Sequence, residues 1–427
     1  MVRLTEDEQR MLDGGNGKFK QKAMEFVVRY ANVLGAEELC EVSRATLFIG
    51  AQRYLDCYSA GEDYRKIFSE FYLSSDEVLE LGQIAENCDA QTCGAACDLE
   101  DFEKTRVSPG HHKKNASFLG ETLKMGISIV DSCTPYYVGW VPLMGERFVS
   151  TESSNVTVSN TVFGAYGNAD GVEAAVCAAI TGRTPKWGMH LKENRFGTCL
   201  FSIDFEVDSL LEWDVLGFTL GRLLPKNEVP VLTGRLSRPD IHKLRQLCSS
   251  ISVTSAAEIC HIVGLTPEAQ TLEMALGHKK PKYEINVTKA EFDKSFAMLC
   301  DEGRGAVDFV SIGCPHLSLW ELKQIAKHLE GRKVSPSAEL QIWTDYATKE
   351  MAAVNGYAKT IEASGAYLLT GSCPVLIKES HKNAFAMVMH GAKQAWSIRH
   401  QSKVPVYYGS IGQCIDAAVN GKWEGRL

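Results

Sequence analysis

The chain has 427 residues, of which 45% are hydrophobic, so it can bury a large core and has room for about two or three domains. Its net charge of -8, with lysines and arginines scattered along the chain, argues against a nucleic-acid surface. Fourteen cysteines without a signal peptide after Met1, and no apolar stretch that reaches the roughly 20 residues of a membrane span, favour a soluble cytoplasmic protein.

The first half of the chain is expected to mix helices with short strands. Thr5 followed by Glu8 predicts a capped helix, and a second helix is expected from Gly17. Further helices are expected over 62–71, 76–87, 118–125 and 172–181, and strands over 45–50 and 127–130. Segments 88–98 and 150–171 are expected to be loops, the second facing a ligand because it is rich in Ser, Thr, Asn and Gly.

From about residue 205 the pattern alternates regularly. Strands are expected over 229–232, 251–254, 282–287, 307–312, 338–344 and 366–370, with helices over 208–221, 239–248, 256–262, 267–276, 289–299, 318–328 and 346–363. Strands that alternate with helices predict an α/β fold with a parallel, covered sheet. We therefore divide the chain into approximate subdomains 1–205 and 206–427.

Three cysteines occur in nearly the same local sequence. Cys133, Cys314 and Cys373 each follow an apolar run, and each has a proline one or two residues later. Proline ends strand pairing and biases the preceding residue toward extended geometry, so these thiols are expected at strand ends. Because open α/β sheets bind ligands at the carboxyl ends of their strands, the three thiols predict one metal site built by the fold.

The chemistry of that site has several interpretations. Structural zinc usually takes four ligands in close pairs, whereas three dispersed thiolates leave an iron-sulfur cluster or a metal ion open to substrate. Such an open position suits a Lewis-acid dehydratase, while buried thiols without a metal and a zinc enzyme remain alternatives. Cys88, Cys93 and Cys97 fit no standard metal motif and are interpreted as pocket wall, and His111-His112 as a solvated turn.

Other polar residues have a functional and a structural interpretation. Ser153, Ser154 and Asn160 could bind a polyoxygenated ligand or form a polar surface turn. Arg183 and Arg195 could clamp a carboxylate or phosphate, or could be structural. No GxGxxG or Walker pattern is present, so a nucleotide cofactor is not indicated.

Several segments together closely resemble the large subunit of the aconitase X family. The resemblance runs from Leu4 to the last residues of the chain and rests on these motifs: Ser132 to Tyr136, Glu152 to Ser154, Asn160 to Ala165, Ala179 to Pro185, Gly188 to Leu191, Gly313 to His316, Ser372 to Val375 and Gly409 to Ile411. It implies an α/β, aconitase-like fold with several α/β subdomains around a central iron-sulfur cleft, lacking the swivelling domain.

The resemblance also implies a site. Its cluster, 4Fe-4S rather than 2Fe-2S or mononuclear iron, would be held by Cys133, Cys314 and Cys373. The expected substrate contacts are Gly50, Ala51, Gln52, Cys93, Gly94, Ser153, Ser154 and Lys393. The catalytic base is expected on a separate small swivelling-domain subunit, which makes the enzyme a heterodimer.

The implied activity is that of a hydro-lyase acting on a small hydroxy acid. The first expectation is a cis-3-hydroxy-L-proline dehydratase-like enzyme, and the alternative is the large subunit of a mevalonate 5-phosphate dehydratase. A non-catalytic, cluster-containing binding protein is the alternative of another class. Where relatives have Arg-Thr after the Gly-Ala pair, this chain has Tyr166 to Asp170, and Cys93-Gly94 replaces an asparagine with proline or alanine. We expect the loop 166–170 to decide the substrate.

Overall fold

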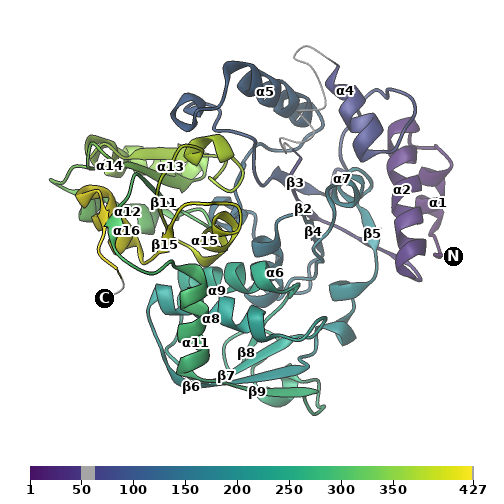
Figure 1. The fold of residues 1–427 in the computed structure, drawn as a ribbon. Coiled ribbons are helices and arrows are strands. Elements are labelled where there is room, and N and C mark those ends of the chain that lie inside the picture. The colour runs from purple at the N-terminus through teal and green to yellow at the C-terminus, as the bar shows by residue number, and fades with distance from the viewer. Residues whose placement is uncertain (50–62, 426–427) are drawn as a thin grey trace.

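The computed structural model describes residues 1–49 and 63–425. Gly50, Ala51 and Gln52, three of the predicted substrate contacts, therefore lie outside the described residues. Three parallel sheets, each with its own helices, surround the middle of the molecule (Figure 1). We call these the first, second and third units, in chain order.

The first unit is built on the parallel sheet β3-β2-β4. The predicted capping box of Thr5 and Glu8 is confirmed, as is the buried helix that ends at Gly182. The strands are β2 (Arg44–Leu47), β3 (Asp89–Thr92) and β4 (Phe148–Ser150), with an antiparallel pair of β1 (Leu39–Glu41) and β5 (Arg183–Pro185). The helices are α1 (Glu6–Leu12), α2 (Lys18–Leu34), α4 (Tyr64–Ile67) with a following π turn (Phe68–Tyr72), α5 (Pro109–Lys124), α6 (Ser153–Thr161) and α7 (Val172–Thr181).

Several predictions for this unit are wrong. Residues 76–87 form no helix, because the backbone N–H groups of Ile84 and Ala85 donate to carbonyls of distant segments instead. His111 and His112 lie in the first two turns of α5, which Ser108 caps, rather than in a solvated turn. Segment 88–98 contains β3, 127–130 makes a single bridge rather than a strand, and nine residues of the expected loop 150–171 form the buried helix α6.

The second unit holds the parallel sheet β8-β7-β6-β9. Its strands are β6 (Cys199–Val207), β7 (Pro230–Leu236), β8 (His261–Ile262) and β9 (Tyr283–Val287), and its helices are α8 (Leu210–Leu223), α9 (Ile241–Thr254), α10 (Leu272–Ala275) and α11 (Lys289–Leu299). The predicted strand 251–254 is wrong because α9 continues through it, and the predicted helix 256–262 is wrong because it ends in β8. Sequence reasoning missed β6, which spans residue 205.

The third unit has five parallel strands in the order β13-β12-β11-β14-β15. They are β11 (Phe309–Ile312), β12 (Glu339–Thr344), β13 (Tyr367–Thr370), β14 (Met387–Met389) and β15 (Val406–Tyr408), and β10 (Gly305–Ala306) pairs with β16 (Lys422–Trp423). The helices are α12 (Leu319–Leu329), α13 (Tyr346–Val354), α14 (Tyr357–Ala363), α15 (Ala392–Arg399) and α16 (Ile411–Asn420). The predicted strands are confirmed, but the expected helix 346–363 is broken at Gly356, which has a φ of 78°.

One hydrophobic core joins the second and third units. It runs from Phe201 and Leu216 in the second unit to Met389 and Ala395 in the third, so these two units pack as one body. Short 3-10 turns occupy Phe102–Thr105, Pro135–Val138, Gly188–His190, Lys192–Arg195 and Lys378–His381. The thirteen described cysteines are all free thiols. No helix in residues 1–49 and 63–425 is long and apolar enough to cross a membrane.

Candidate functional site

A cavity of about 260 Å³ lies where the three units meet. It brings together seven residues that were predicted as metal ligands or substrate contacts: Cys93, Cys133, Ser153, Ser154, Cys314, Cys373 and Lys393. Its other lining residues are Phe48, Thr151, Glu152, Ser249, Pro315, Val375, Leu376 and Ser397. Residues that are more than 200 positions apart in the chain thus share one small space.

Parallel strand ends place two of the three thiols. Cys314 follows β11 and Cys373 follows β13, and both strands pair in parallel with β12, so both thiols lie at the same edge of the sheet. Gly313 makes the turn after β11 with a φ of 116°, and a Cβ there would lie 2.4 Å from the Trp343 carbonyl oxygen. Only glycine fits this turn without displacing backbone. Cys133 reaches the cavity from the first unit.

His316 connects the three cysteine segments. Its backbone N–H donates to Cys133 Sγ at 3.3 Å, its Nε2 lies 2.8 Å from the Ser372 carbonyl oxygen, and its Nδ1 lies 3.4 Å from Ser132 Oγ. Burial lowers the pKa of this imidazole, so the ring is neutral near pH 7. A neutral ring can donate from Nε2 to the carbonyl and accept at Nδ1 from the hydroxyl, which fixes both loops.

A buried ion pair between Arg245 and Glu321 holds the backbone of His316 in place. Arg245 on α9 donates to both carboxylate oxygens of Glu321 at 2.7 Å, and the two side chains are 0% and 1% exposed. The same guanidinium donates to the His316 carbonyl oxygen at 3.1 Å. The neighbouring Gln246 donates to the Cys314 carbonyl oxygen at 3.1 Å, so α9 holds the backbone on both sides of Pro315.

Another part of the cavity lining is polar. Lys393, in the first turn of α15, places Nζ 2.6 Å from Glu152 Oε1, 3.0 Å from Ser153 Oγ and 2.8 Å from Ser154 Oγ. Burial alone lowers the pKa of Lys393, but the Glu152 carboxylate and the neighbouring thiols raise it well above its usual value. The cavity therefore contains a charged ammonium beside two hydroxyls at the N-terminus of α6.

The three thiols line one cavity without converging on a single point. Within residues 1–49 and 63–425, no three His, Cys, Asp or Glu side chains are close enough to hold one ion. A cluster binds each thiolate at a different iron, so its ligands need not converge on one point.

The electrostatics of the thiols agree with a cluster. Burial raises the pKa of Cys133 to about 12, while the His316 N–H lowers it; burial also raises the pKa of Cys373, while the N–H groups of Leu376 and Val375 lower it. These thiols need a bound cation to ionise, and the N–H donors to sulfur are already in place.

Other predicted residues lie elsewhere. A Cβ on Gly94 would lie 2.6 Å from the Phe48 ring, so Gly94 packs behind that ring and does not line the cavity. Cys88 packs in the core of the first unit, and Cys97 accepts a hydrogen bond from Asn115. The three cysteines of the C-x4-C-x3-C motif thus have separate surroundings, and only Cys93 faces the cavity.

The candidate anion-binding residues outside the cavity are structural. Arg183 pairs with Glu8, and Arg195 pairs with Glu268 while its guanidinium lies 4.0 Å from the centre of the Tyr166 ring. Asn160 donates to two backbone carbonyls, of Gly167 at 2.7 Å and of Glu258 at 2.9 Å. None of residues 166–170 lines the 260 Å³ cavity, although Ala169 lines the neighbouring pocket that also contains Ser153, so the role of this loop in substrate choice stays a prediction.

Sequence reasoning missed Glu152 and Ser249 as cavity residues. Glu152 caps α6 by accepting the Asn155 N–H at 2.9 Å, and the Glu-Ser-Ser sequence before an unpredicted helix was the available signal. Ser249 is buried in α9 and accepts a hydrogen bond from Ser154 at 3.1 Å, which no local pattern indicates.

Comparison with protein families gives one consistent result. Models of the first, second and third domains of aconitase X match residues 1–193, 197–297 and 307–420, respectively. Together the three matches leave out only short connections and the C-terminal residues.

Curated relatives and a solved structure agree with these matches. The phosphomevalonate dehydratase large subunit of Methanosarcina mazei is 29% identical over 98% of both chains. The cis-3-hydroxy-L-proline dehydratase of Pseudomonas aeruginosa is 27% identical over 98% of this chain and 70% of its own. The crystal structure of Thermococcus kodakaraensis aconitase X in its holo form superimposes with a TM-score of 0.80, at 26% identity, over 98% of this chain and 100% of the other.

Proposed function

The chain belongs to the aconitase X family, and on that premise we propose that it dehydrates a small hydroxy acid with the help of an iron-sulfur cluster. Its curated relatives are named dehydratases, which are hydro-lyases. The observation that carries the proposal is one small cavity that is lined both by three thiols and by a charged lysine with two serines.

Cys133, Cys314 and Cys373 would hold the cluster. When bound, an iron with an open position would supply a Lewis acid for the departing hydroxyl. The chain's own contribution is to position these thiols through His316 and α9 at the wall of a 260 Å³ cavity.

Lys393, Ser153 and Ser154 would bind the substrate carboxylate. The ammonium provides a charge-assisted hydrogen bond, and the first turn of α6 adds its backbone N–H groups. The cavity wall also carries one negative charge, because the Glu152 carboxylate lies 2.6 Å from the Lys393 ammonium. This pairing matches an amino acid zwitterion, whose carboxylate would face Lys393 and whose ammonium would face Glu152.

This charge balance favours cis-3-hydroxy-L-proline or a similar hydroxy amino acid. A phosphate ester is a dianion and would need additional cations, whereas Lys393 is the one Lys or Arg among the described residues that line the cavity. Mevalonate 5-phosphate remains the second candidate substrate, since the phosphomevalonate dehydratase large subunit of M. mazei is 29% identical to this chain.

A small swivelling subunit would complete the site. Relatives named "large subunit" imply a small partner, and we propose that this partner carries the catalytic base. Ser153 lines both the 260 Å³ cavity and an adjoining pocket of about 930 Å³, which gives a partner segment a route toward the substrate.

The test combines cofactor analysis with turnover. The protein is prepared anaerobically with its small subunit, analysed for iron and acid-labile sulfide, and assayed with cis-3-hydroxy-L-proline and mevalonate 5-phosphate. We expect iron and sulfide to be lost in Cys314→Ser but retained in Cys177→Ser, a matched control whose thiol donates only to a backbone carbonyl in the first unit.

Each outcome decides between the candidates. Turnover of the proline derivative alone supports the proposed substrate, and turnover of the phosphate ester alone replaces it with the second candidate. A full iron-sulfur content without turnover of any hydroxy acid in a broad panel would favour the non-catalytic binding protein. Activity with zinc in place of iron would refute the cluster.

A further inference from the structure

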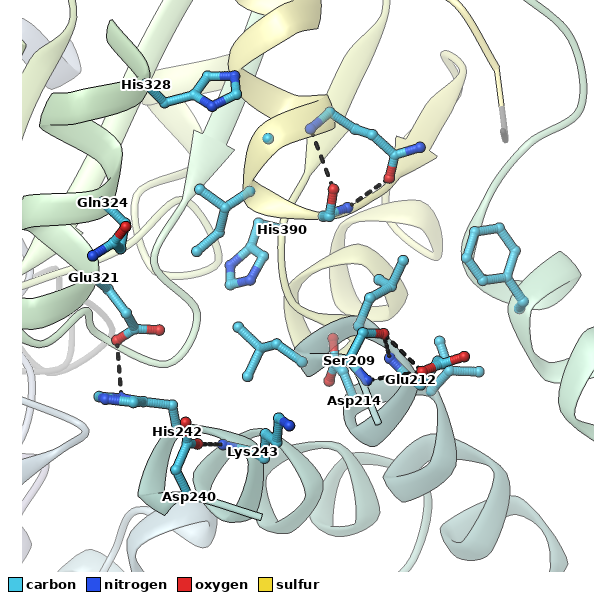
Figure 2. A pocket seen from close by; sticks show the side chains of 18 of the residues that line it. Ser209, Glu212, Asp214, Asp240, His242, Lys243, Glu321, Gln324, His328 and His390 are labelled. Carbon is cyan, nitrogen blue, oxygen red and sulfur yellow. Dashed lines mark hydrogen bonds and ion pairs between the residues drawn. The ribbon is translucent and has the colours of Figure 1, made fainter. Parts of the chain in front are cut away.

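A second, larger pocket lies between the second and third units, away from the cysteine cavity. It has a volume of about 950 Å³ and is lined by the first turns of α8, α9 and α16 together with residues of α11 and α12 (Figure 2). Glu321 lies between this pocket and the cysteine cavity. It lines the pocket, and its carboxylate pairs with Arg245, which also contacts His316. The proposed dehydration makes no use of this space.

Three helix N-termini open into the pocket. The helices α8, α9 and α16 have 14, 14 and 10 residues, and their N-caps are Ser209, Asp240 and Ser410. Each cap side chain accepts the N–H of the third helical residue, which leaves the N–H groups of the first two residues directed out of the helix end. Such ends carry partial positive charge and favour anions.

A buried histidine without a partner lies at the same place. His390 is 3% exposed, and its ring stands among the lining residues in Figure 2. In the part of the chain that the structure describes, His390 Nδ1 has no hydrogen-bond partner. Burial lowers the pKa of His390 to about 4, so the ring is neutral near pH 7, and its unpartnered Nδ1 is a buried polar atom in a residue that lines the pocket. A buried polar atom of this kind is costly unless a ligand or water bonds to it.

The acidic residues of the pocket are already engaged. Asp214 accepts hydrogen bonds from Tyr408 Oη at 2.5 Å and from the Ala392 N–H at 2.7 Å, and it also bonds to Ser250. Asp240 caps α9, and Glu212 forms the capping box of α8. The negative charges therefore serve the protein's own donors, whereas the helix ends keep unsatisfied N–H groups.

The remaining walls are basic and apolar. Lys243, Lys289 and Lys327 line the pocket. Lys243 pairs with Asp208 at 3.2 Å and Lys289 with Asp293 at 2.6 Å, and both are weak surface pairs that an anionic ligand can replace. Phe292 and Phe296 are 3% and 7% exposed, and Trp320, which stacks on His242, is 54% exposed. An occupant of this pocket should therefore combine an anionic group with an apolar, flat body.

We propose that this pocket binds a small organic oxyanion, with its carboxylate or phosphate at the N-termini of α8, α9 and α16 beside His390 and its apolar body against Phe292, Phe296 and Trp320. The site is separate from the proposed dehydratase cavity and does not depend on that function.

The test measures binding by isothermal titration to the full chain with its small subunit, using 1-naphthyl phosphate and 1-naphthoate as probes. We expect saturable binding of one molecule per chain for at least one of them, and the stronger of the two identifies the anionic group. Inorganic phosphate, which lacks the apolar body, and 1-naphthol, which lacks the charge, should each bind at least tenfold more weakly.

The sharpest variant is Gly412→Asp with Gly412→Asn as its matched control. Gly412 is the second residue of α16, and a Cβ there would meet its nearest heavy atom at 3.7 Å, so both side chains fit. Aspartate suits the first turn of a helix but brings a negative charge to the proposed anion site. Gly412→Asp should weaken probe binding at least tenfold, and Gly412→Asn by less than threefold.

A second variant gives an independent result if Gly412→Asp fails to fold. His390→Leu removes the unpartnered nitrogen and should also weaken probe binding, with folding checked by circular dichroism. Equal binding by wild type and Gly412→Asp, binding of 1-naphthol as tight as that of the anions, or no saturable binding of either anion would each overturn the proposal.

Discussion

Breaking the buried pair of Arg245 and Glu321 should destabilise the protein strongly. Both side chains are at most 1% exposed, and two hydrogen bonds of 2.7 Å join them. Removing one partner leaves an uncompensated buried charge, which costs about 3–5 kcal/mol. We therefore expect Glu321→Gln and Arg245→Met each to lower the free energy of unfolding by about that amount.

The double variant gives the control. Arg245→Met with Glu321→Leu removes both charges. Its remaining losses are the capping bond of Glu321 to the Ser318 N–H and the hydrogen bond of Arg245 to the His316 carbonyl oxygen, each worth about 1 kcal/mol. Urea unfolding of the wild type, Arg245→Met, Glu321→Leu and the double variant measures the coupling energy. Single variants that lose less than 1 kcal/mol, or a double variant that loses the sum of both, would refute this reasoning.

The same variants distinguish the effect of the ion pair on the stability of the whole protein from the effect of Arg245 on the position of the cysteine loops. Arg245→Met removes the donor to the His316 carbonyl oxygen, whereas Glu321→Gln leaves that guanidinium in place. Arg245→Met should therefore retain less iron after gel filtration than Glu321→Gln does. Equal iron retention would show that this hydrogen bond does not position His316.

Three further predictions concern pH, substrate binding and a turn. Burial, with smaller contributions from nearby arginines, lowers the pKa of His190 to about 3, below its usual 6.5, so only the unfolded chain takes up this proton between the two values. Stability should therefore rise with pH from about 3 to 6.5, with a total on the order of 4 kcal/mol, and His190→Gln should flatten this slope in urea titrations. Lys393→Met should reduce kcat/KM about 10- to 150-fold by removing a charge-assisted bond, while the exposed Lys403→Met should match wild type in the same assay. Gly313→Ala should lower the thermal unfolding temperature through a loss of about 1–3 kcal/mol, whereas Gly110→Ala, whose Cβ meets nothing within 4 Å, should not.

The α/β, aconitase-like fold was predictable because its elements have clear local signals. Alternating apolar strands and amphipathic helices predicted three of the five strands of the third unit but missed β14 and β15, and the strand-end pattern placed Cys314 and Cys373 at one edge of the sheet. Residues 76–87 and helix α6 were mispredicted because tertiary contacts decide them. The apolar residues of 76–87 pack on the core without a helix, and α6 buries polar side chains such as Asn155 and Thr157.

The contacts among the polar residues of the site could not be predicted from local sequence patterns. Lys393 and Glu152 are 241 positions apart and come from different units, so no spacing rule connects them. Lys393 entered the prediction only through the family resemblance, and Glu152 did not enter it as a site residue. His316 and Arg245 act through buried hydrogen bonds to backbone atoms, which leave no periodic signal in the sequence.

Cys133 belongs to the first unit, whereas Cys314 and Cys373 belong to the third. A cofactor held by all three thiols would work as a cross-link between these two units, and its binding energy would add to the stability of a contact that already includes a shared cluster of Cys97, Trp343 and Leu369. Loss of the cofactor would then do more than stop turnover. It would weaken the contact between the two units, and the protein without its cofactor should be cut faster by proteases at their junction than the loaded enzyme.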